Sequence, residues 1–286
     1  MENKIKAESK KTKIFVLGAG FQKCGTSWAY EYLQNMSNFN AGAYKEYHVW
    51  DATDLNIAQS SIVKKVSILD RVKRSPKYIK FKMQNDAQFY FDYFQDLYND
   101  SKNLTADITP AYSALSKKRF QFIKDEFEKR DIKVKVLVFM RDPVERIKSA
   151  VRFNLDRHCH TEGVSHDIKD FENAIEEYFK SEHCTSRTRY GETLENIYSV
   201  FDRDDVYCGI YESMFSSEEI TRFSEFLNLP ADTSYSKVVI NKTSGTKLDL
   251  PELEEEIAQY YKSTYAYCSR YFPVTKELWR SSTVEN

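Results

Sequence analysis

The chain has 286 residues, of which 41% are hydrophobic and 30% charged, which is enough for one large α/β domain. Its formal net charge of −1 gives no global sign of a nucleic-acid or membrane partner, so basic residues that bind an anion must be gathered locally. No apolar run approaches the roughly 20 residues of a membrane span, and residues 1–13 lack the apolar core of a signal peptide, which favours a cytoplasmic protein.

The N-terminal segment contains the most informative pattern. Residues 1–12 predict a disordered tail, and residues 13–286 predict a single domain. An apolar run over residues 14–17 predicts a buried strand, a glycine-containing loop follows, and a helical pattern covers residues 26–36. This order is typical of a loop that holds a phosphate group with backbone N–H groups and a helix N-terminus.

The position of the lysine sets this loop apart from a nucleotide-triphosphate P-loop, which reads G-x-x-x-x-G-K-[ST]. Gly20 and Gly25 have the required spacing, but Thr26 stands where the lysine should be. The lysine lies inside the loop instead, at Lys23. The loop therefore predicts a site for a phosphate-like group that differs from the standard ATP site.

The rest of the chain alternates between strand and helix patterns. After a loop over residues 37–52, the predicted helices cover residues 53–75, 89–98, 119–129, 216–227 and 251–266, and the predicted strands cover residues 78–83, 104–108, 133–140 and 206–211. Such alternation predicts a central parallel sheet flanked by helices. The five cysteines follow no disulfide framework, which predicts reduced thiols.

A second phosphate-binding candidate follows the strand over residues 133–140. Arg141 lies at the end of that strand, Asp142 and Pro143 suit the start of a helix, and Ser149 lies about two turns along it. The carboxyl ends of strands are where open α/β sheets bind ligands. Arg146, on the same helix, is expected on a solvated face.

Four segments together resemble a known family. Residues 22–28, Gln-Lys-Cys-Gly-Thr-Ser-Trp, resemble the 5′-phosphosulfate loop of sulfotransferases that use 3′-phosphoadenosine 5′-phosphosulfate (PAPS), and residues 141–149 resemble their 3′-phosphate motif. Residues 45–51 and 107–112 are similar to segments of the branch that sulfates glycosaminoglycans. The resemblance implies a P-loop NTPase-like sulfotransferase fold, PAPS as co-substrate, adenosine 3′,5′-bisphosphate as product and no metal.

The resemblance also implies which residues contact the donor. Lys23 would stabilise the leaving phosphate, and Arg141 with Ser149 would bind the 3′-phosphate. A loop near residue 242 would close over that phosphate, although an ordinary surface loop is an equal alternative. The full set of expected donor contacts is Gln22, Lys23, Cys24, Gly25, Thr26, Ser27, Trp28, Arg141, Ser149, Lys242, Ser244 and Gly245.

On the acceptor side, Glu46 matches the glutamate that serves as general base in that branch. A base of this kind is expected to have its pKa lifted by burial. His48 would hold the acceptor or share the proton, Asp51 would orient the site, and Asp107 completes the expected acceptor-binding set. The alternative for Glu46 is an exposed loop acid paired with Lys45.

The histidines and cysteines between residues 158 and 184 invite a zinc hypothesis, but their spacing matches no usual zinc pattern. A polar flap beside the acceptor is the preferred interpretation.

Two other functions remain open. A P-loop nucleotide kinase would require magnesium and a lysine after Gly25, and a non-catalytic nucleotide-binding protein would not need Lys23 and Glu46 to face one cavity. The resemblance implies that the acceptor is a hydroxyl group of a carbohydrate. The sequence does not indicate which carbohydrate, which position is sulfated or the oligomeric state.

Overall fold

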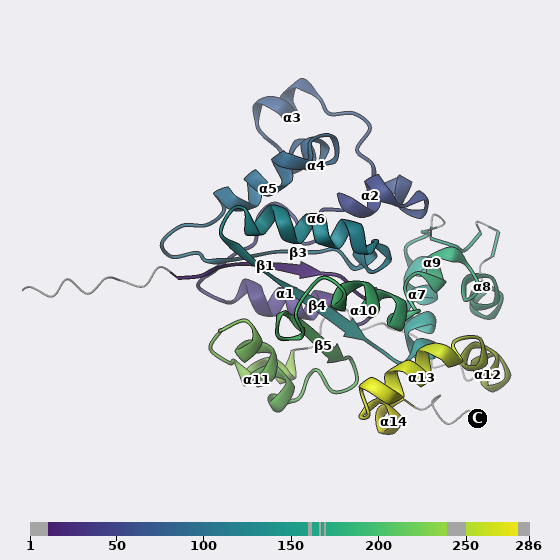
Figure 1. Cartoon of the computed structure of the whole chain (residues 1–286). Helices are drawn as coiled ribbons and strands as arrows, with labels where there is room; N and C mark the ends of the chain where they lie inside the picture. The colour runs from purple at the N-terminus through teal and green to yellow at the C-terminus, as the bar shows by residue number, and fades with distance from the viewer. Residues whose placement is uncertain (1–10, 160–161, 166, 169, 239–249, 280–286) are drawn as a thin grey trace, which may run out of the picture.

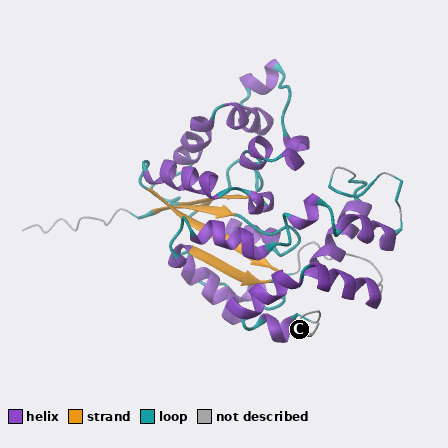
Figure 2. Ribbon diagram, turned by 45° about the vertical axis from the view of Figure 1, so that its right-hand side comes forward, coloured by secondary structure: helices purple, strands orange, loops and turns teal. Residues whose placement is uncertain are grey.

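A computed structural model describes residues 11–159, 162–165, 167–168, 170–238 and 250–279 of the chain. A five-stranded sheet forms its centre, with the strand order β2-β3-β1-β4-β5 and parallel pairing throughout. The strands are β1 (Lys13–Gly18), β2 (Phe39–Asn40), β3 (Leu104–Ile108), β4 (Ile132–Met140) and β5 (Val206–Ile210). The predicted central parallel sheet is confirmed, and all five carboxyl ends lie at one edge (Figure 2).

The central strands are buried on both faces, as expected for parallel strands covered by helices. Phe15 of β1 points to one face, where its ring stacks on Phe127 of α6 (Lys117–Glu128) at 4.0 Å and meets Phe94 of α5 (Ala87–Asp96) at 4.7 Å between ring centroids. On the other face, Tyr32 of α1 (Thr26–Gln34) shares a hydrogen bond of 2.6 Å with Ser224 of α11 (Ser217–Phe226). Figure 1 shows these two helical layers above and below the sheet.

The helices that cover the sheet have the following bounds. Up to the end of β4 they are α1 (Thr26–Gln34), α2 (Trp50–Asp54), α3 (Ile68–Val72), α4 (Pro76–Asn85), α5 (Ala87–Asp96) and α6 (Lys117–Glu128). Beyond β4 they are α7 (Pro143–Asp156), α8 (Phe171–Tyr178), α9 (Glu182–Thr185), α10 (Tyr190–Tyr198), α11 (Ser217–Phe226), α12 (Pro251–Tyr260), α13 (Lys262–Tyr271) and α14 (Thr275–Leu278). Short 3₁₀ turns are η1 (Asn56–Ser61), η2 (Pro110–Ala114), η3 (Arg203–Asp205) and η4 (Thr233–Lys237).

The predicted strand over residues 78–83 is wrong, because this segment lies within the helix α4. Ser75 caps the helix by accepting a hydrogen bond from the backbone N–H of Tyr78, and Pro76 occupies the first turn. This start signal outweighs the alternation of apolar and basic residues that suggested a strand. The predicted helix over residues 53–75 is also too long, since it contains the end of α2, the 3₁₀ turn η1 and the short α3.

The helix after β4 begins as predicted, with Asp142 as its N-cap and Pro143 in its first turn. Arg146 is not on a solvated face, however, and this expectation is wrong. The side chain is fully buried, where it donates hydrogen bonds to the Tyr178 hydroxyl at 3.3 Å and to Cys184 Sγ at 2.8 Å. Helices α8 to α10 cover this side of α7, which sequence spacing alone did not reveal.

Three further expectations concern the rest of the chain. All five cysteines are free thiols, as predicted. Within the described residues, no helix is long and apolar enough to cross a bilayer. Residues 1–10 of the expected tail, together with Lys242, Ser244 and Gly245 of the expected phosphate loop, lie outside the described residues.

Candidate active site

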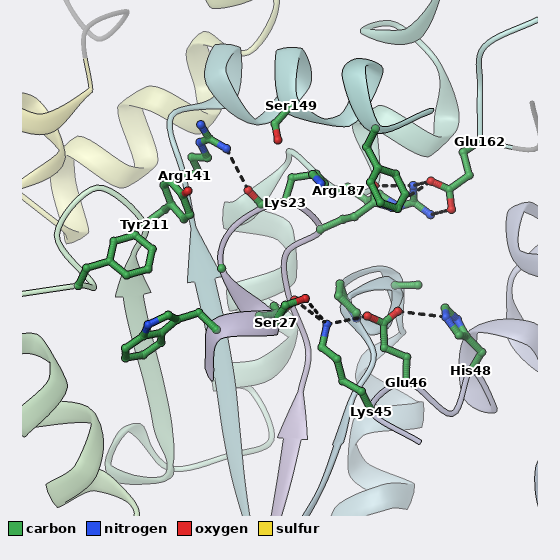
Figure 3. A pocket seen from close by; sticks show the side chains of 18 residues that line it. Lys23, Ser27, Lys45, Glu46, His48, Arg141, Ser149, Glu162, Arg187 and Tyr211 are labelled. Carbon is green, nitrogen blue, oxygen red and sulfur yellow. Dashed lines mark hydrogen bonds and ion pairs between the residues drawn. The ribbon is translucent and has the colours of Figure 1, made fainter. Parts of the chain in front are cut away.

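A cavity of about 300 Å³ opens at the carboxyl edge of the sheet. Its walls come from the loops that follow β1, β2, β3, β4 and β5 and from the segment between α7 and α10 (Figure 3). The lining residues are Gln22, Lys23, Gly25, Thr26, Ser27, Trp28, Lys45, Glu46, His48, Pro110, Ala111, Arg141, Ser149, Phe153, Glu162, Arg187, Tyr211 and Phe215. Most of the described residues singled out from the sequence therefore share one cavity.

The loop after β1 presents Lys23 to this cavity. Lys23 adopts a left-handed backbone conformation, with φ of 67°, and its Nζ lies 4.2 Å from the centre of the Phe153 ring. Burial, with smaller contributions from the nearby Arg141 and Arg157 charges, lowers the pKa of Lys23 to about 8. An added anion would offset this repulsion between cations, so the loop is suited to a negatively charged ligand.

Gly25 ends the loop and starts helix α1. Its φ is 95°, a backbone conformation that residues with a side chain rarely adopt. A Cβ added there would also collide with the sulfur of Met214, so both the backbone and the packing favour glycine. No side chain caps the first turn of α1 at Thr26. The N–H groups of an uncapped helix start are suited to bind an anion.

The structure places Cys24 differently from the other members of this loop. Its side chain is fully buried, and its Sγ lies 3.6 Å from the backbone oxygen of Gln22. Burial raises the pKa of the thiol to about 12. Cys24 does not line the cavity, so the expected donor contact from its side chain is not supported by this geometry.

Trp28 lines the cavity from the first turns of α1. Its ring stacks on Tyr32 at 5.5 Å and stands perpendicular to Phe215 at 5.7 Å between centroids. Only 3% of the residue is exposed. Trp28 is thus both a core residue and part of the cavity wall.

Arg141 reaches the cavity from the end of β4. Its guanidinium lies over the Tyr211 ring at 4.3 Å, and one nitrogen donates a hydrogen bond to the backbone oxygen of Lys23 at 3.4 Å. Its ion pair with the half-buried Glu145 is long, at 3.7 Å. The Nε atom is buried and has no partner among the described residues, and Ser149 lies nearby on α7 (Figure 3).

The loop after β2 supplies a connected row of charged side chains. Lys45 Nζ donates hydrogen bonds to the Ser27 hydroxyl at 3.0 Å and to Glu46 Oε1 at 2.7 Å (Figure 3). The other oxygen of Glu46 lies 3.3 Å from His48 Nε2, and His48 Nδ1 lies 2.7 Å from Asp51 Oδ2. The row connects Ser27 at the start of α1 with Glu46, His48 and Asp51.

The pKa of Glu46 differs from the expectation of a raised value, which is wrong. Burial alone would raise it, but the hydrogen bonds and charges of His48 and Lys45 lower it to about 2. Burial alone would lower the pKa of His48, but the hydrogen bonds to Asp51 and Glu46 raise it to about 9. At neutral pH the loop therefore holds an ionised carboxylate beside a protonated imidazole.

Asp107 lies behind this loop and does not line the cavity, which contradicts its expected place in the acceptor-binding set. It is fully buried and accepts hydrogen bonds from the backbone N–H of Tyr47 at 3.3 Å and from the hydroxyls of Tyr90, Thr109 and Tyr112. Burial raises its pKa to about 6, because these hydrogen bonds offset desolvation only in part. Asp107 thus holds the backbone of the loop between β2 and α2 through the N–H of Tyr47.

Sequence reasoning missed a second group of polar residues across the cavity. Arg187 donates hydrogen bonds of 2.9 Å to Glu162 Oε2 and to the side-chain oxygen of Gln22. The amide nitrogen of Gln22 in turn donates to Glu162 Oε2 at 2.9 Å. This group ties the segment after α7 to the donor loop. No local motif surrounds Arg187, so only the tertiary structure identifies it. Lys45 was recognised only as a partner of Glu46, and its contact with Ser27 was not foreseen.

The zinc hypothesis finds no support in the described part of the chain, where no group of three or more potential ligands is found. Cys184 is buried against Arg146, and His183 lies 3.1 Å from the backbone oxygen of Ile57. His160 and His166 lie outside the described residues.

Two solved structures resemble the fold of this chain. A sulfotransferase of Alicyclobacillus acidocaldarius is 16% identical and superposes with a TM-score of 0.55, covering 92% of this chain and 96% of that chain. The sulfotransferase STF9 of Mycobacterium avium is 12% identical, with a TM-score of 0.50 and coverage of 92% and 77%. The curated proteins contain no match.

These two structures show the fold. The sequence itself shows the family, because the family model of the sulfotransferase domain matches residues 11–267. The matched range includes every described loop that lines the cavity. The match is to the domain as a whole and does not distinguish the branch that acts on glycosaminoglycans. This match covers most of the sequence, and the chain therefore belongs to the sulfotransferase domain family.

Proposed function

We propose that the protein transfers the sulfuryl group of PAPS to an acceptor hydroxyl, with Glu46 as general base and Lys23 stabilising the leaving phosphate. The observation that carries this proposal is that Lys23 and Glu46 line one cavity, together with Arg141 and Ser149. In the transfer, the acceptor oxygen forms a bond to sulfur while the bond from sulfur to the phosphate oxygen breaks. The acceptor proton passes to Glu46, and adenosine 3′,5′-bisphosphate leaves.

The protonation states favour Glu46 over His48 as the base. A base must hold no proton before the reaction, and the pKa values of about 2 for Glu46 and about 9 for His48 meet this condition only for Glu46 at neutral pH. The protonated His48 instead donates to the acceptor or to Glu46. Lys23 supplies positive charge where negative charge develops on the leaving oxygen.

Lys45 would connect donor binding to the strength of this base. In the structure, its ammonium group bridges the Ser27 hydroxyl and Glu46. A phosphosulfate group held by the donor loop competes with Glu46 for the same ammonium group. As Lys45 turns toward the donor, the pKa of Glu46 rises and the carboxylate becomes a better proton acceptor.

The acceptor we favour is a carbohydrate. The motif likeness of residues 45–51 points to it, and the acceptor side of the cavity is polar, with Glu46 and His48 facing the group formed by Arg187, Glu162 and Gln22 (Figure 3). Several hydroxyl groups of a sugar can be held by such a set of donors and acceptors.

The most informative test is to measure thermal stabilisation by adenosine 3′,5′-bisphosphate and by ATP with magnesium. We expect the bisphosphate to raise the unfolding temperature more at equal concentration, because tighter binding to the folded state stabilises it. A preference for ATP with magnesium would favour a kinase. Bisphosphate binding without formation of a sulfate ester from PAPS and a panel of sugars, by mass spectrometry, would favour a non-catalytic binding protein.

Replacement of Arg141 by alanine should weaken binding of adenosine 3′,5′-bisphosphate by about 1.5–3 kcal/mol, the scale of a hydrogen bond to a charged group. Binding of adenosine 5′-phosphate, which lacks the 3′-phosphate, should change little. Titration calorimetry with both ligands checks this prediction. Equal losses for both would show that Arg141 does not contact the 3′-phosphate.

The rate should also decline in alkaline solution. Lys23 acts in its charged form, and its pKa is about 8, so kcat/KM for the donor should fall as pH rises through about 8. In kcat the decline should lie at higher pH, because the bound anionic donor stabilises the ammonium group and raises its pKa. A Lys23→Arg variant that keeps activity should lose this decline, because arginine stays charged. If the variant shows the same decline at the same pH, another group titrates.

A further inference from the structure

A protruding segment far from the cavity has a composition unlike the rest of the surface. We call residues 64–77 the basic tip; it consists of α3 and its flanks and forms the outermost point of the layer that contains α4 and α5 (Figure 1). Its exposed basic side chains are Lys64, Lys65, Arg71, Lys73, Arg74 and Lys77.

The same tip exposes large apolar side chains. Ile68, Leu69 and Val72 are 82%, 60% and 76% exposed, and no other large apolar residue of the described chain exceeds 50%. Their spacing places all three on one side of the helical turn. Single exposed apolar residues are ordinary, but a cluster at such exposure on one protrusion indicates a contact surface.

The tip contains six basic side chains and one acidic side chain, so it has an excess of positive charge. Throughout the part of the chain that the structure describes, none of the six basic side chains forms an ion pair. The only acidic residue of the tip, Asp70, accepts hydrogen bonds from the hydroxyls of Ser67 and Ser75. Asp70 thus braces the turn from within, and the tip stays strongly basic in a chain whose net charge is −1.

The base of the tip is held firmly. The Gln84 side chain of α4 donates hydrogen bonds to the backbone oxygens of His48 at 2.7 Å and Ser61 at 3.0 Å, and accepts one from the N–H of Val63 at 2.8 Å. The tip is therefore presented from a fixed platform.

We propose that the basic tip docks the protein on the surface of an anionic phospholipid bilayer. Aliphatic side chains surrounded by lysine and arginine are the combination that inserts at the boundary between headgroups and acyl chains. A convex tip needs no groove in a soft bilayer, whereas a protein partner would have to provide one. A second copy would bring like charges together, and a soluble polyanion would gain nothing from the aliphatic residues. The expectation of no membrane partner rested on the net charge, which hides this local concentration.

Vesicle flotation with the full-length protein tests the proposal. We expect binding to vesicles with about one third phosphatidylserine, little binding to pure phosphatidylcholine, and weakening with added salt. The triple variant Ile68→Ser, Leu69→Ser, Val72→Ser and the double variant Lys73→Glu, Arg74→Glu should each lower the partition coefficient at least about tenfold. The matched control is Lys117→Glu, Lys118→Glu on the exposed first turn of α6, which should bind like the wild type.

Several outcomes would overturn the proposal. The first is that the protein does not bind anionic vesicles, and the second is that the control variant loses as much binding as the tip variants. The third is that the serine variant binds as well as the wild type, which would indicate a surface that binds a soluble polyanion through charge alone. Retention on immobilised heparin that the serine substitutions leave unchanged, without vesicle binding, would likewise point to a polyanion. All variants alter exposed positions, so their unfolding temperatures should equal that of the wild type. A variant with a lowered unfolding temperature is left out of the comparison.

Discussion

Replacement of Glu46 by glutamine should lower sulfuryl transfer by about 10²–10⁴-fold, the usual contribution of a general base. Glutamine has nearly the same shape as glutamate but accepts no proton at neutral pH. Donor affinity should stay within a few fold, because Lys23, Arg141 and the start of α1 remain in place. Steady-state kinetics, with calorimetric titration of adenosine 3′,5′-bisphosphate, separates the two effects.

A matched control exists within the same cavity. Glu162→Gln removes one carboxylate charge on the opposite wall, where it pairs with Arg187, and should lower turnover far less than Glu46→Gln. Equal losses would show that the net charge of the cavity, rather than proton transfer to Glu46, limits the rate. A larger loss in His48→Asn than in Glu46→Gln would make His48 the base.

Replacement of Lys23 by methionine should lower turnover by roughly 10²-fold or more, the scale for the loss of one group that stabilises charge in the transition state. Methionine keeps the unbranched stem over Phe153 and removes only the ammonium group. The free energy of unfolding should hardly fall, because the lowered pKa shows that the folded protein disfavours charge at this site. Thermal unfolding and turnover, measured together, check both parts.

The contrast with Arg141 makes this prediction specific. Lys23→Met should act mainly on kcat, whereas Arg141→Ala should act mainly on donor affinity. If Lys23→Met only weakened donor binding and left kcat unchanged, Lys23 would be a ground-state contact. If it unfolded the protein, its role would be structural.

The central fold could be predicted because two of its strands contain clear apolar runs. β1 contains the run over residues 14–17, and β4 contains the run over residues 136–140, which Arg141 follows. Gly25 marks the start of α1, and Asp142 with Pro143 marks the start of α7. Residues 78–83 misled the prediction because α4 lies at the periphery and buries only Met83, so its sequence shows no helical apolar stripe. A capping serine followed by proline was the better evidence.

The candidate site could be predicted where its residues belong to local motifs, but not where tertiary packing places them. Lys23, Glu46 and Arg141 share a cavity because they follow strands whose carboxyl ends meet at one edge. The lowered pKa of Glu46 depends on distances to Lys45 and His48, and the burial of Asp107 depends on tyrosines from α5 and η2. Such distances are not encoded in a spacing pattern.

The order of the strands divides the cavity into two halves with separate origins. The donor loops follow β1 and β4, adjacent strands within the sheet, while the base loop follows the edge strand β2, and Arg187 with Glu162 comes from the segment between α7 and α10. Acceptor preference should therefore be transferable between relatives by grafting these two peripheral segments onto an unchanged donor half. Such a graft has to keep the position of Lys45 relative to helix α1, because in the described structure only its ammonium group bridges Ser27 and Glu46.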